Sequence, residues 1–100
     1  MSATRERDWQ RIVVATARQL GWMTYHTHDS RRSDPGFPDL VMVRERVVFA
    51  ELKTATGKVS EDQLAWLGKL EAAGAEVYLW RPSDEHEVLS VLKRRRAVAR

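Results

Sequence analysis

The chain has 100 residues, a length that suits one domain with a single hydrophobic core. It contains no cysteine, which excludes disulfide bridges and cysteine-ligated zinc or iron–sulfur centres. Its apolar runs fall far short of the roughly 20 residues that a membrane span needs. These properties predict a soluble protein of the reducing cytoplasm, with no membrane partner.

The formal net charge of +3 is unevenly distributed along the chain. The stretch 93–100 holds five basic residues and no acidic one, whereas the stretch 1–92 is slightly acidic. We therefore expect one domain over residues 1–92, followed by a basic tail over 93–100. A basic helix end suits the helix dipole, and a basic tail equally suits contact with nucleic acid, so charge alone leaves both open.

Hydrophobic periodicity and turn residues predict the elements of the chain. Gly21 and Gly74 end two helices, and Pro82 ends the last strand. In chain order the pattern predicts a helix over 5–20, a strand over 22–28, a loop over 29–36, strands over 38–44 and 47–53, a loop over 54–59, a helix over 60–73, a strand over 76–80 and a helix over 84–95.

This order, αβββαβα, predicts an α/β fold. Three strands form an antiparallel meander, and a right-handed crossover helix then leads to a strand parallel to the third. The sheet is therefore mixed, with helices on both faces. In the crossover helix we expect Leu64, Leu67 and either Leu70 or Glu71 to face the sheet, and we expect the four tryptophans of the chain to anchor the core.

The most informative segments are Gly36-Phe37-Pro38-Asp39 and, at the end of an apolar run, Glu51-Leu52-Lys53. Alternate side chains of a strand point to opposite faces, so Glu51 and Lys53 share a face. An ion pair between them explains the pattern poorly, because i,i+2 side chains of a strand lie parallel. Two carboxylates converging on a hard cation, beside an ammonium, instead suit metal-assisted phosphodiester hydrolysis.

The register of the predicted hairpin limits this interpretation. With a two-residue turn at Glu45-Arg46, Asp39 would lie opposite Leu52 and point away from Glu51 and Lys53. Directly opposed residues share a face, so the two carboxylates converge only if the turn has an odd number of residues or the pair carries a β-bulge. The metal site therefore requires a three-residue turn or a bulge.

The two segments resemble the PD-(D/E)XK nuclease superfamily and, more narrowly, the VRR-NUC domain. The resemblance covers roughly residues 5–92 and includes Leu20-Gly21-Trp22, the helix start Ser60-Glu61-Asp62-Gln63-Leu64-Ala65-Trp66 and the stretch 74–82. An Asp…Glu-x-Lys triplet alone arises often by chance. Its order, the flanking glycine and proline and the following Gln63 helix make the resemblance specific. It implies a restriction-endonuclease-like core.

The resemblance also implies the roles of the site residues. Asp39 and Glu51 would hold Mg²⁺ or Mn²⁺, with the Leu52 backbone carbonyl completing the protein ligands. Lys53 would position the attacking water and stabilise charge at phosphorus. Gln63 would project over the metal from its helix. The implied catalytic residues are therefore Asp39, Glu51, Lys53 and Gln63.

Two assignments have competing interpretations. Gln63 also fits the third position of a capping box that begins at Ser60. The family often contributes an acid from its first helix, and here Glu6 falls on the apolar stripe as a candidate metal ligand, with Asp8 as a rival. The alternative for Glu6 is a solvated first-turn carboxylate that the helix dipole favours.

Histidines and cations complete the candidate set. His26 matches a histidine common in the family near the site, but His26 and His28 lack the further ligands that zinc needs. Basic residues of the loops and the tail are candidate DNA contacts: Arg31, Arg32, Lys58, Arg94, Arg95 and Arg96.

The sequence thus predicts a metal-dependent DNA endonuclease, selective for branched DNA such as a Holliday junction or a flap. The alternative is a non-catalytic DNA-binding module of nuclease ancestry. One small domain offers one active site, whereas resolving a four-way junction takes two cuts, so we expect a homodimer. The resemblance further implies a protein of bacterial origin, or one encoded by a phage in a bacterial host.

Overall fold

The computed structural model describes residues 4–27 and 34–95. Its elements follow the predicted order, with slightly shorter ends and one added 3-10 turn at Pro82. They are α1 (Glu6–Gln19), β1 (Met23–His26), β2 (Leu40–Val43), β3 (Val47–Leu52), α2 (Glu61–Ala72), β4 (Glu76–Trp80), η1 (Pro82–Asp84) and α3 (Glu85–Lys93). None of the helices in these ranges has the length and apolarity of a membrane span.

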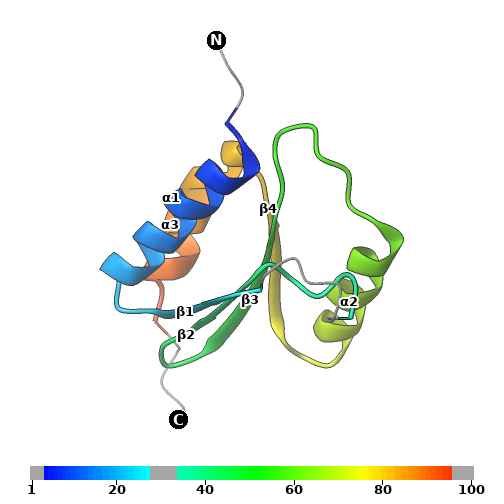
Figure 1. The fold of residues 1–100 in the computed structure, drawn as a ribbon. Helices are drawn as coiled ribbons and strands as arrows, with labels where there is room; N and C mark the ends of the chain where they lie inside the picture. The colour runs from blue at the N-terminus through cyan, green and yellow to red at the C-terminus, as the bar shows by residue number, and fades with distance from the viewer. Residues whose placement is uncertain (1–3, 28–33, 96–100) are drawn as a thin grey trace.

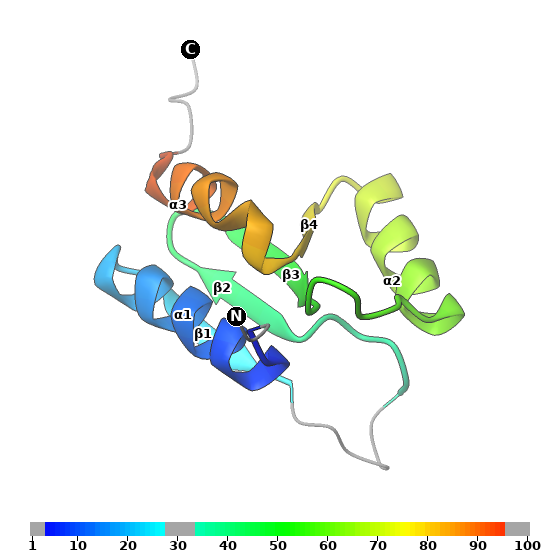
Figure 2. The same ribbon diagram turned by 90° about the horizontal axis from the view of Figure 1, so that it is seen from above.

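The four strands form one mixed sheet in the order β1-β2-β3-β4. The first three strands are antiparallel neighbours, and β4 lies parallel to β3 after the crossover through α2. Figures 1 and 2 show α1 and α3 side by side over one face of the sheet and α2 on the other side. The predicted α/β architecture, with helices on both faces, is confirmed.

The core lies between the sheet and the pair α1 and α3. Three tryptophans are buried there, and each indole N–H has an acceptor, as burial of a tryptophan requires. Trp9 donates to the Trp80 carbonyl at 3.0 Å, Trp22 to the Leu92 carbonyl at 2.9 Å, and Trp80 to the Glu87 carboxylate at 3.0 Å. These side chains anchor the helical layer to the sheet, as predicted.

Helix α2 packs differently from the prediction. Leu64 is 56% exposed, so its predicted contact with the sheet is wrong. The half-buried side of α2 instead carries Trp66, Leu67 and Leu70. Trp66 lies outside the core because it packs edge-on against Phe37, with ring centroids 5.1 Å apart. This aromatic contact sets which side of α2 turns inward.

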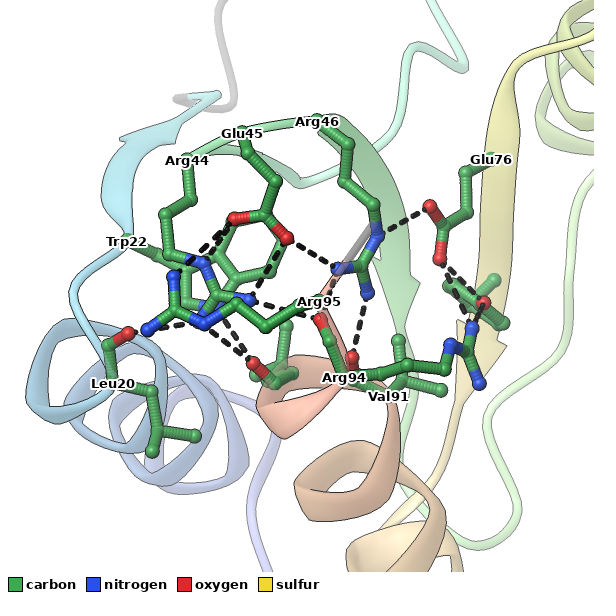
Figure 3. A network of polar contacts seen from close by, with 11 residues as sticks. Leu20, Trp22, Arg44, Glu45, Arg46, Glu76, Val91, Arg94 and Arg95 are labelled. Atoms are coloured by element: carbon green, nitrogen blue, oxygen red, sulfur yellow. Dashed lines mark hydrogen bonds and ion pairs between the residues drawn. The ribbon is translucent and has the colours of Figure 1, made fainter. Parts of the chain in front are cut away.

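The turn between β2 and β3 is tied to both helices of the opposite layer (Figure 3). Arg44 Nη1 donates to the Leu20 carbonyl at the end of α1, at 2.9 Å. Arg46 Nη2 donates to the Val91 carbonyl in the last turn of α3, at 2.6 Å. Both guanidinium groups also lie over the Trp22 ring, 4.5 and 5.0 Å from its centroid. These contacts to two helix ends stabilise the turn.

Candidate active site

The Gly-Phe-Pro-Asp segment is wedged between α2 and the sheet. Gly36 has a φ of +94°, and a Cβ at this position would lie 2.5 Å from the backbone carbon of Asp62. Only glycine therefore lets the loop touch the first turn of α2. The next ring, Phe37, meets Trp66 and Phe49 edge-on, at 5.1 and 6.1 Å between centroids. The segment fixes the distance between α2 and β3 next to the first candidate carboxylate.

The register brings the two candidate carboxylates together. Val43 pairs with Val47, so the turn has three residues, which is one of the two conditions that the metal site required. The same register, continued by one residue beyond the ladder, puts Asp39 opposite Glu51. Asp39 Oδ2 accepts the backbone N–H of Leu52 at 2.9 Å, which holds the carboxylate against the end of β3.

Glu51 is buried, with 1% of its surface exposed. Its Oε2 accepts a hydrogen bond from Gln63 Nε2 at 2.7 Å and lies 3.6 Å from Lys53 Nζ. The i,i+2 ion pair is thus present, contrary to expectation, because the long lysine stem allows its ammonium to approach. Glu51 Oε1 has no hydrogen-bond partner among the described residues. Leaving such an atom unpaired costs about 1–3 kcal/mol, so the arrangement favours a further ligand.

The pKa shifts of Asp39 and Glu51 also favour a further ligand at this site. Burial, followed by the neighbouring Asp39 charge, raises the pKa of Glu51 to about 7. Burial also raises the pKa of Asp39, although the hydrogen bond from the Leu52 backbone and the charge of Lys53 oppose this. A buried and a half-buried carboxyl group side by side resist ionising together, and a cation between them would relieve that cost.

Gln63 satisfies both interpretations of its role. Its Oε1 accepts the Ser60 N–H at 2.9 Å, and its own backbone N–H donates to Ser60 Oγ at 3.1 Å, which completes a capping box. Its Nε2 meanwhile donates to Glu51. The cap uses the amide oxygen and the site uses the amide nitrogen, so the two roles do not compete.

The first helix contributes no third carboxylate to this pair. Glu6 is exposed in the first turn, which corrects its predicted place on the apolar stripe, and Asp8 accepts a hydrogen bond from Arg5 at 2.9 Å. In the ranges 4–27 and 34–95, no three acidic or histidine side chains gather as metal ligands. The physical reason is that α1 packs through Trp9 on the sheet face opposite Glu51.

His26 also faces away from the carboxylates. It pairs with Leu40 across β1 and β2, so both point toward the α1 side of the sheet, whereas Glu51 points to the other side. It is still close enough to Asp39 to lower the pKa of that carboxyl against the larger effect of burial. Thr27, the next residue, also donates its N–H to the Asp39 carbonyl at 2.8 Å.

The loop after β3 lies beside the site and carries Lys58, which is exposed as a DNA contact requires. Arg81, a residue to which the sequence pattern assigned no role, holds this loop. Its Nη1 donates to the carbonyls of Thr54 and Gly57, at 2.6 and 2.8 Å. The sequence signal that could have identified Arg81 is its position as a basic residue directly after Trp80, the buried last residue of β4.

The predicted tail contacts lie at the other end of the sheet (Figure 3). Arg94 Nη2 is 3.5 Å from Glu76 Oε2, and Arg95 Nη1 is 3.7 Å from Glu45 Oε1. At about 3.3 Å per residue, this hairpin end is about 17 Å from Glu51 along β3. The remaining candidates Arg31, Arg32 and Arg96, together with His28, fall outside the described residues.

Comparison with known proteins agrees with this fold. Two solved structures, named "VRR_NUC domain protein" and "VRR_NUC domain", share 17% and 25% identity with this chain. The first match covers 92% of this chain and 88% of that one, with a TM-score of 0.74; the second covers 89% and 97%, with 0.72. A search of curated proteins found no significant match.

A third structure has the same core. It is Archaeoglobus fulgidus Hjc, described as a Holliday junction resolvase from an archaeal hyperthermophile, and it shares 19% identity, with a TM-score of 0.56 over 76% of this chain and 69% of that one. This chain thus shares its mixed-sheet α/β fold with the VRR_NUC domain structures and with Hjc. The family model described as VRR-NUC domain matches residues 2–84. The chain therefore belongs to the VRR-NUC domain family.

Proposed function

We propose that this chain is a metal-dependent endonuclease that hydrolyses phosphodiester bonds of DNA. The observation that carries the proposal is the convergence of Asp39 and Glu51 at the open end of the β2–β3 hairpin, away from its turn, with Lys53 3.6 Å from Glu51. Membership of a nuclease domain family supports the same chemistry.

The residues at this point fit a hard divalent cation, Mg²⁺ or Mn²⁺. Both side chains offer carboxylate oxygens, and Glu51 Oε1 is buried without a hydrogen-bond partner in the described ranges. We propose Asp39 and Glu51 as ligands, with the Leu52 carbonyl as a third. A bound cation of this kind polarises a phosphoryl oxygen and lowers the pKa of a coordinated water.

The other two side chains serve the carboxylates and the substrate. Lys53 is 13% exposed, so its ammonium presents a positive charge in a weakly solvated place, where negative charge develops at phosphorus during hydrolysis. Gln63 holds Glu51 Oε2 by its hydrogen bond and thereby leaves Oε1 to face a cation. In this proposal Lys53 is the catalytic cation, and Gln63 positions Glu51.

We further propose branched DNA as the substrate and a homodimer as the active form. The structural likeness to Hjc, which is described as a Holliday junction resolvase, supports the first part. An uncovered apolar sheet face supports the second: Met23, Tyr25, Val43 and Val47 are exposed there, the first two by 76% and 65%. Exposed apolar surface of this kind marks interaction sites. A cytoplasmic location in a bacterial cell remains a prediction.

Incubation with a four-way DNA junction tests the proposal, with Mg²⁺ or with a chelator. We expect cleavage by the parent with Mg²⁺ and none with the chelator. Asp39→Asn should bind the junction but not cut it, because it removes a ligand charge while keeping the volume and the acceptor for Leu52. Lys53→Ala should bind almost normally and cut about 10²–10³ times more slowly.

Two results would contradict the proposal. Cleavage by Asp39→Asn at the parent rate would refute the assigned metal site. A parent that binds the junction tightly but never cuts it, with either metal, would identify a DNA-binding module instead of an enzyme.

A further inference from the structure

A groove of about 490 Å³ runs between the flank of α1 and the edge strand β1. It lies on the outer side of α1 and borders the hydrophobic core at Val14, which packs against the core residues. Its lining consists of Arg7, Gln10, Arg11, Val14, Ala15, Arg18 and His26. Three guanidinium groups therefore border one depression that the candidate active site does not use.

The arginines form a single stripe. Arg7, Arg11 and Arg18 follow one another at i, i+4 and i+11, which places them on the same side of a helix. In the described ranges, Arg7 and Arg18 make no ion pair. Arg11 is 3.9 Å from Asp8, whose closer partner is Arg5. Asp8, whose pKa Arg11 and Arg7 also lower, offsets part of the charge of these two arginines. The three guanidinium groups still outnumber this one carboxylate, so the stripe suits an anion.

The orientation of Arg18 is set by the sheet. Its Nε donates to Thr24 Oγ1 at 3.0 Å, across the groove from α1 to β1. Between the arginines, Val14 and Ala15 contribute the apolar part of the lining. A depression with cationic edges and an apolar floor matches the phosphates and sugars of a nucleic-acid strand better than a small anion.

The groove leads toward the candidate active site. Its lining includes His26, which pairs with Leu40, the residue after Asp39. Thr27 then donates its backbone N–H to the Asp39 carbonyl at 2.8 Å. At 1.5 Å per residue the stripe is about 16 Å long, which corresponds to about five phosphates of one DNA strand at 3.4 Å each.

We propose that this groove binds the phosphodiester backbone of the DNA arm next to the cleaved bond. The proposal rests on the proposed nuclease function and adds to it the surface that positions the substrate. It also differs from the predicted tail contacts, because Arg94 and Arg95 lie at the hairpin end of the sheet, where they are paired with Glu76 and Glu45.

Salt-dependent binding of junction DNA in chelator tests this surface without interference from cleavage. The variants are Arg7→Ala, Arg11→Ala and their double, because both side chains are exposed and neither holds the fold. Lys69→Ala is the matched control, since it removes one exposed charge from α2, which does not border the groove. Thermal unfolding of each variant verifies that the fold is intact.

The expected result is a smaller slope of log K against log salt concentration, by about 0.9 for each groove arginine and about twice that for the double variant. The affinity of the double variant should fall on the order of tenfold or more at low salt. Lys69→Ala should keep the parent slope. At saturating DNA and Mg²⁺, the control Lys69→Ala should also cut at the parent rate.

The outcomes separate the groove from the nuclease proposal. If the parent binds DNA and the groove variants keep its slope, the groove assignment is wrong, while cleavage can still stand. If the slopes fall as expected but the parent never cuts, the groove is supported and the catalytic assignment is wrong. A parent that binds no DNA at all overturns both.

Discussion

At the scale of single residues, the site consists of a few polar groups, and the burial of its two carboxyl groups opposes their ionisation. Among the described residues, Glu51 accepts a hydrogen bond at Oε2 but not at Oε1, and Asp39 is held by the Leu52 backbone. Burial raises the pKa of both carboxyl groups. The metal-free protein therefore keeps a proton in the site at a pH where an exposed glutamate has lost it. The free energy of unfolding therefore depends on pH through these two carboxyl groups.

The first prediction concerns this linkage. The pKa of Glu51 is about 7 in the folded protein and near 4.5 in the unfolded chain, so the folded state binds more protons between these values. The free energy of unfolding should therefore fall as pH rises from about 4.5 to 7, and then level off. At 1.36 kcal/mol per pKa unit, the loss is on the order of 3–4 kcal/mol, and Asp39 acts in the same direction.

Urea unfolding in chelator at pH 5 and pH 8 measures this effect. Glu51→Gln should be clearly more stable than the parent at pH 8 and close to it at pH 5. Mg²⁺ added at pH 8 should stabilise the parent and leave the variant unchanged. Equal pH dependence in both proteins would show that the pair is not electrostatically strained.

The second prediction separates the two roles of Gln63. Gln63→Ala removes both the cap on Ser60 and the donor to Glu51, and should destabilise the protein by about 1 kcal/mol at any pH. Gln63→Glu keeps the capping box but replaces the donor with a carboxylate beside Glu51. Its stability should be reduced at pH 8 and recover at pH 5, where a protonated carboxyl can donate.

Thermal unfolding at the two pH values distinguishes the cases. If Gln63→Glu matches the parent at pH 8, Gln63 acts as a helix cap alone. If Gln63→Ala unfolds like the parent, the cap contributes nothing.

At the scale of elements, the site depends on how α2 is set against the end of β3. The loop before β2 touches α2 at Gly36, and Phe37 fills the space between Trp66 and Phe49. Gln63 reaches Glu51 from the first turn of the same helix. The glycine contact and the contact to Glu51 thus lie one residue apart along α2, at Asp62 and Gln63.

The third prediction tests this contact with two glycines. Gly36→Ala should destabilise the protein by about 2 kcal/mol or more, because φ is positive and the new Cβ would lie 2.5 Å from the Asp62 backbone. Gly68→Ala, in the middle of α2 with no atom within 4 Å of its Cβ, should stabilise it by about 0.5–1 kcal/mol. Chemical denaturation measures both.

Activity adds a second readout. Gly36→Ala should also slow cleavage, since moving the first turn of α2 moves Gln63 away from Glu51, whereas Gly68→Ala should not. A Gly36→Ala protein as stable and active as the parent would contradict the proposed wedge.

At the scale of the whole molecule, the two faces of the sheet have different roles. One face is covered by α1 and α3 (Figure 1) and forms the core. The other face carries the carboxylates near α2 and an uncovered apolar area near the turn of the β2–β3 hairpin. The hairpin end is tied to α1 and α3 by Arg44 and Arg46. The candidate active site, the apolar area and the arginine groove therefore lie on three different parts of the surface.

The fourth prediction concerns assembly. Light scattering at micromolar concentration should give twice the chain mass of 11.5 kDa. Tyr25→Lys should shift the mass toward one chain, because it puts a charge on the uncovered apolar face. Leu89→Lys, which changes an exposed leucine of α3, should leave the dimer intact. A monomeric parent would refute the dimer and shift the substrate toward flaps or nicked duplex.

Local pattern alone determined most of the fold and singled out the main candidate residues of the site. Strand periodicity put Glu51 and Lys53 on one face, Gly21 and Gly74 marked the ends of two helices, and the order of elements implied the mixed sheet, all of which the structure bears out. Pattern also stated the condition for the site, an odd turn or a bulge, because register follows directly from turn length. The pattern did not determine whether the hairpin has an odd-numbered turn or a β-bulge.

Only the tertiary structure decided which side chains meet. The three-residue turn is stabilised by contacts of Arg44 and Arg46 to helices far away in the sequence, so its length was not readable locally. Leu64 is exposed because Trp66, on the inward side of α2, packs against Phe37. Glu6 is exposed and far from the site because α1 covers the sheet face opposite Glu51. Gln63 serves the cap and the site at once because α2 packs where its amide reaches both. Such contacts depend on long-range packing, which no spacing along the chain encodes.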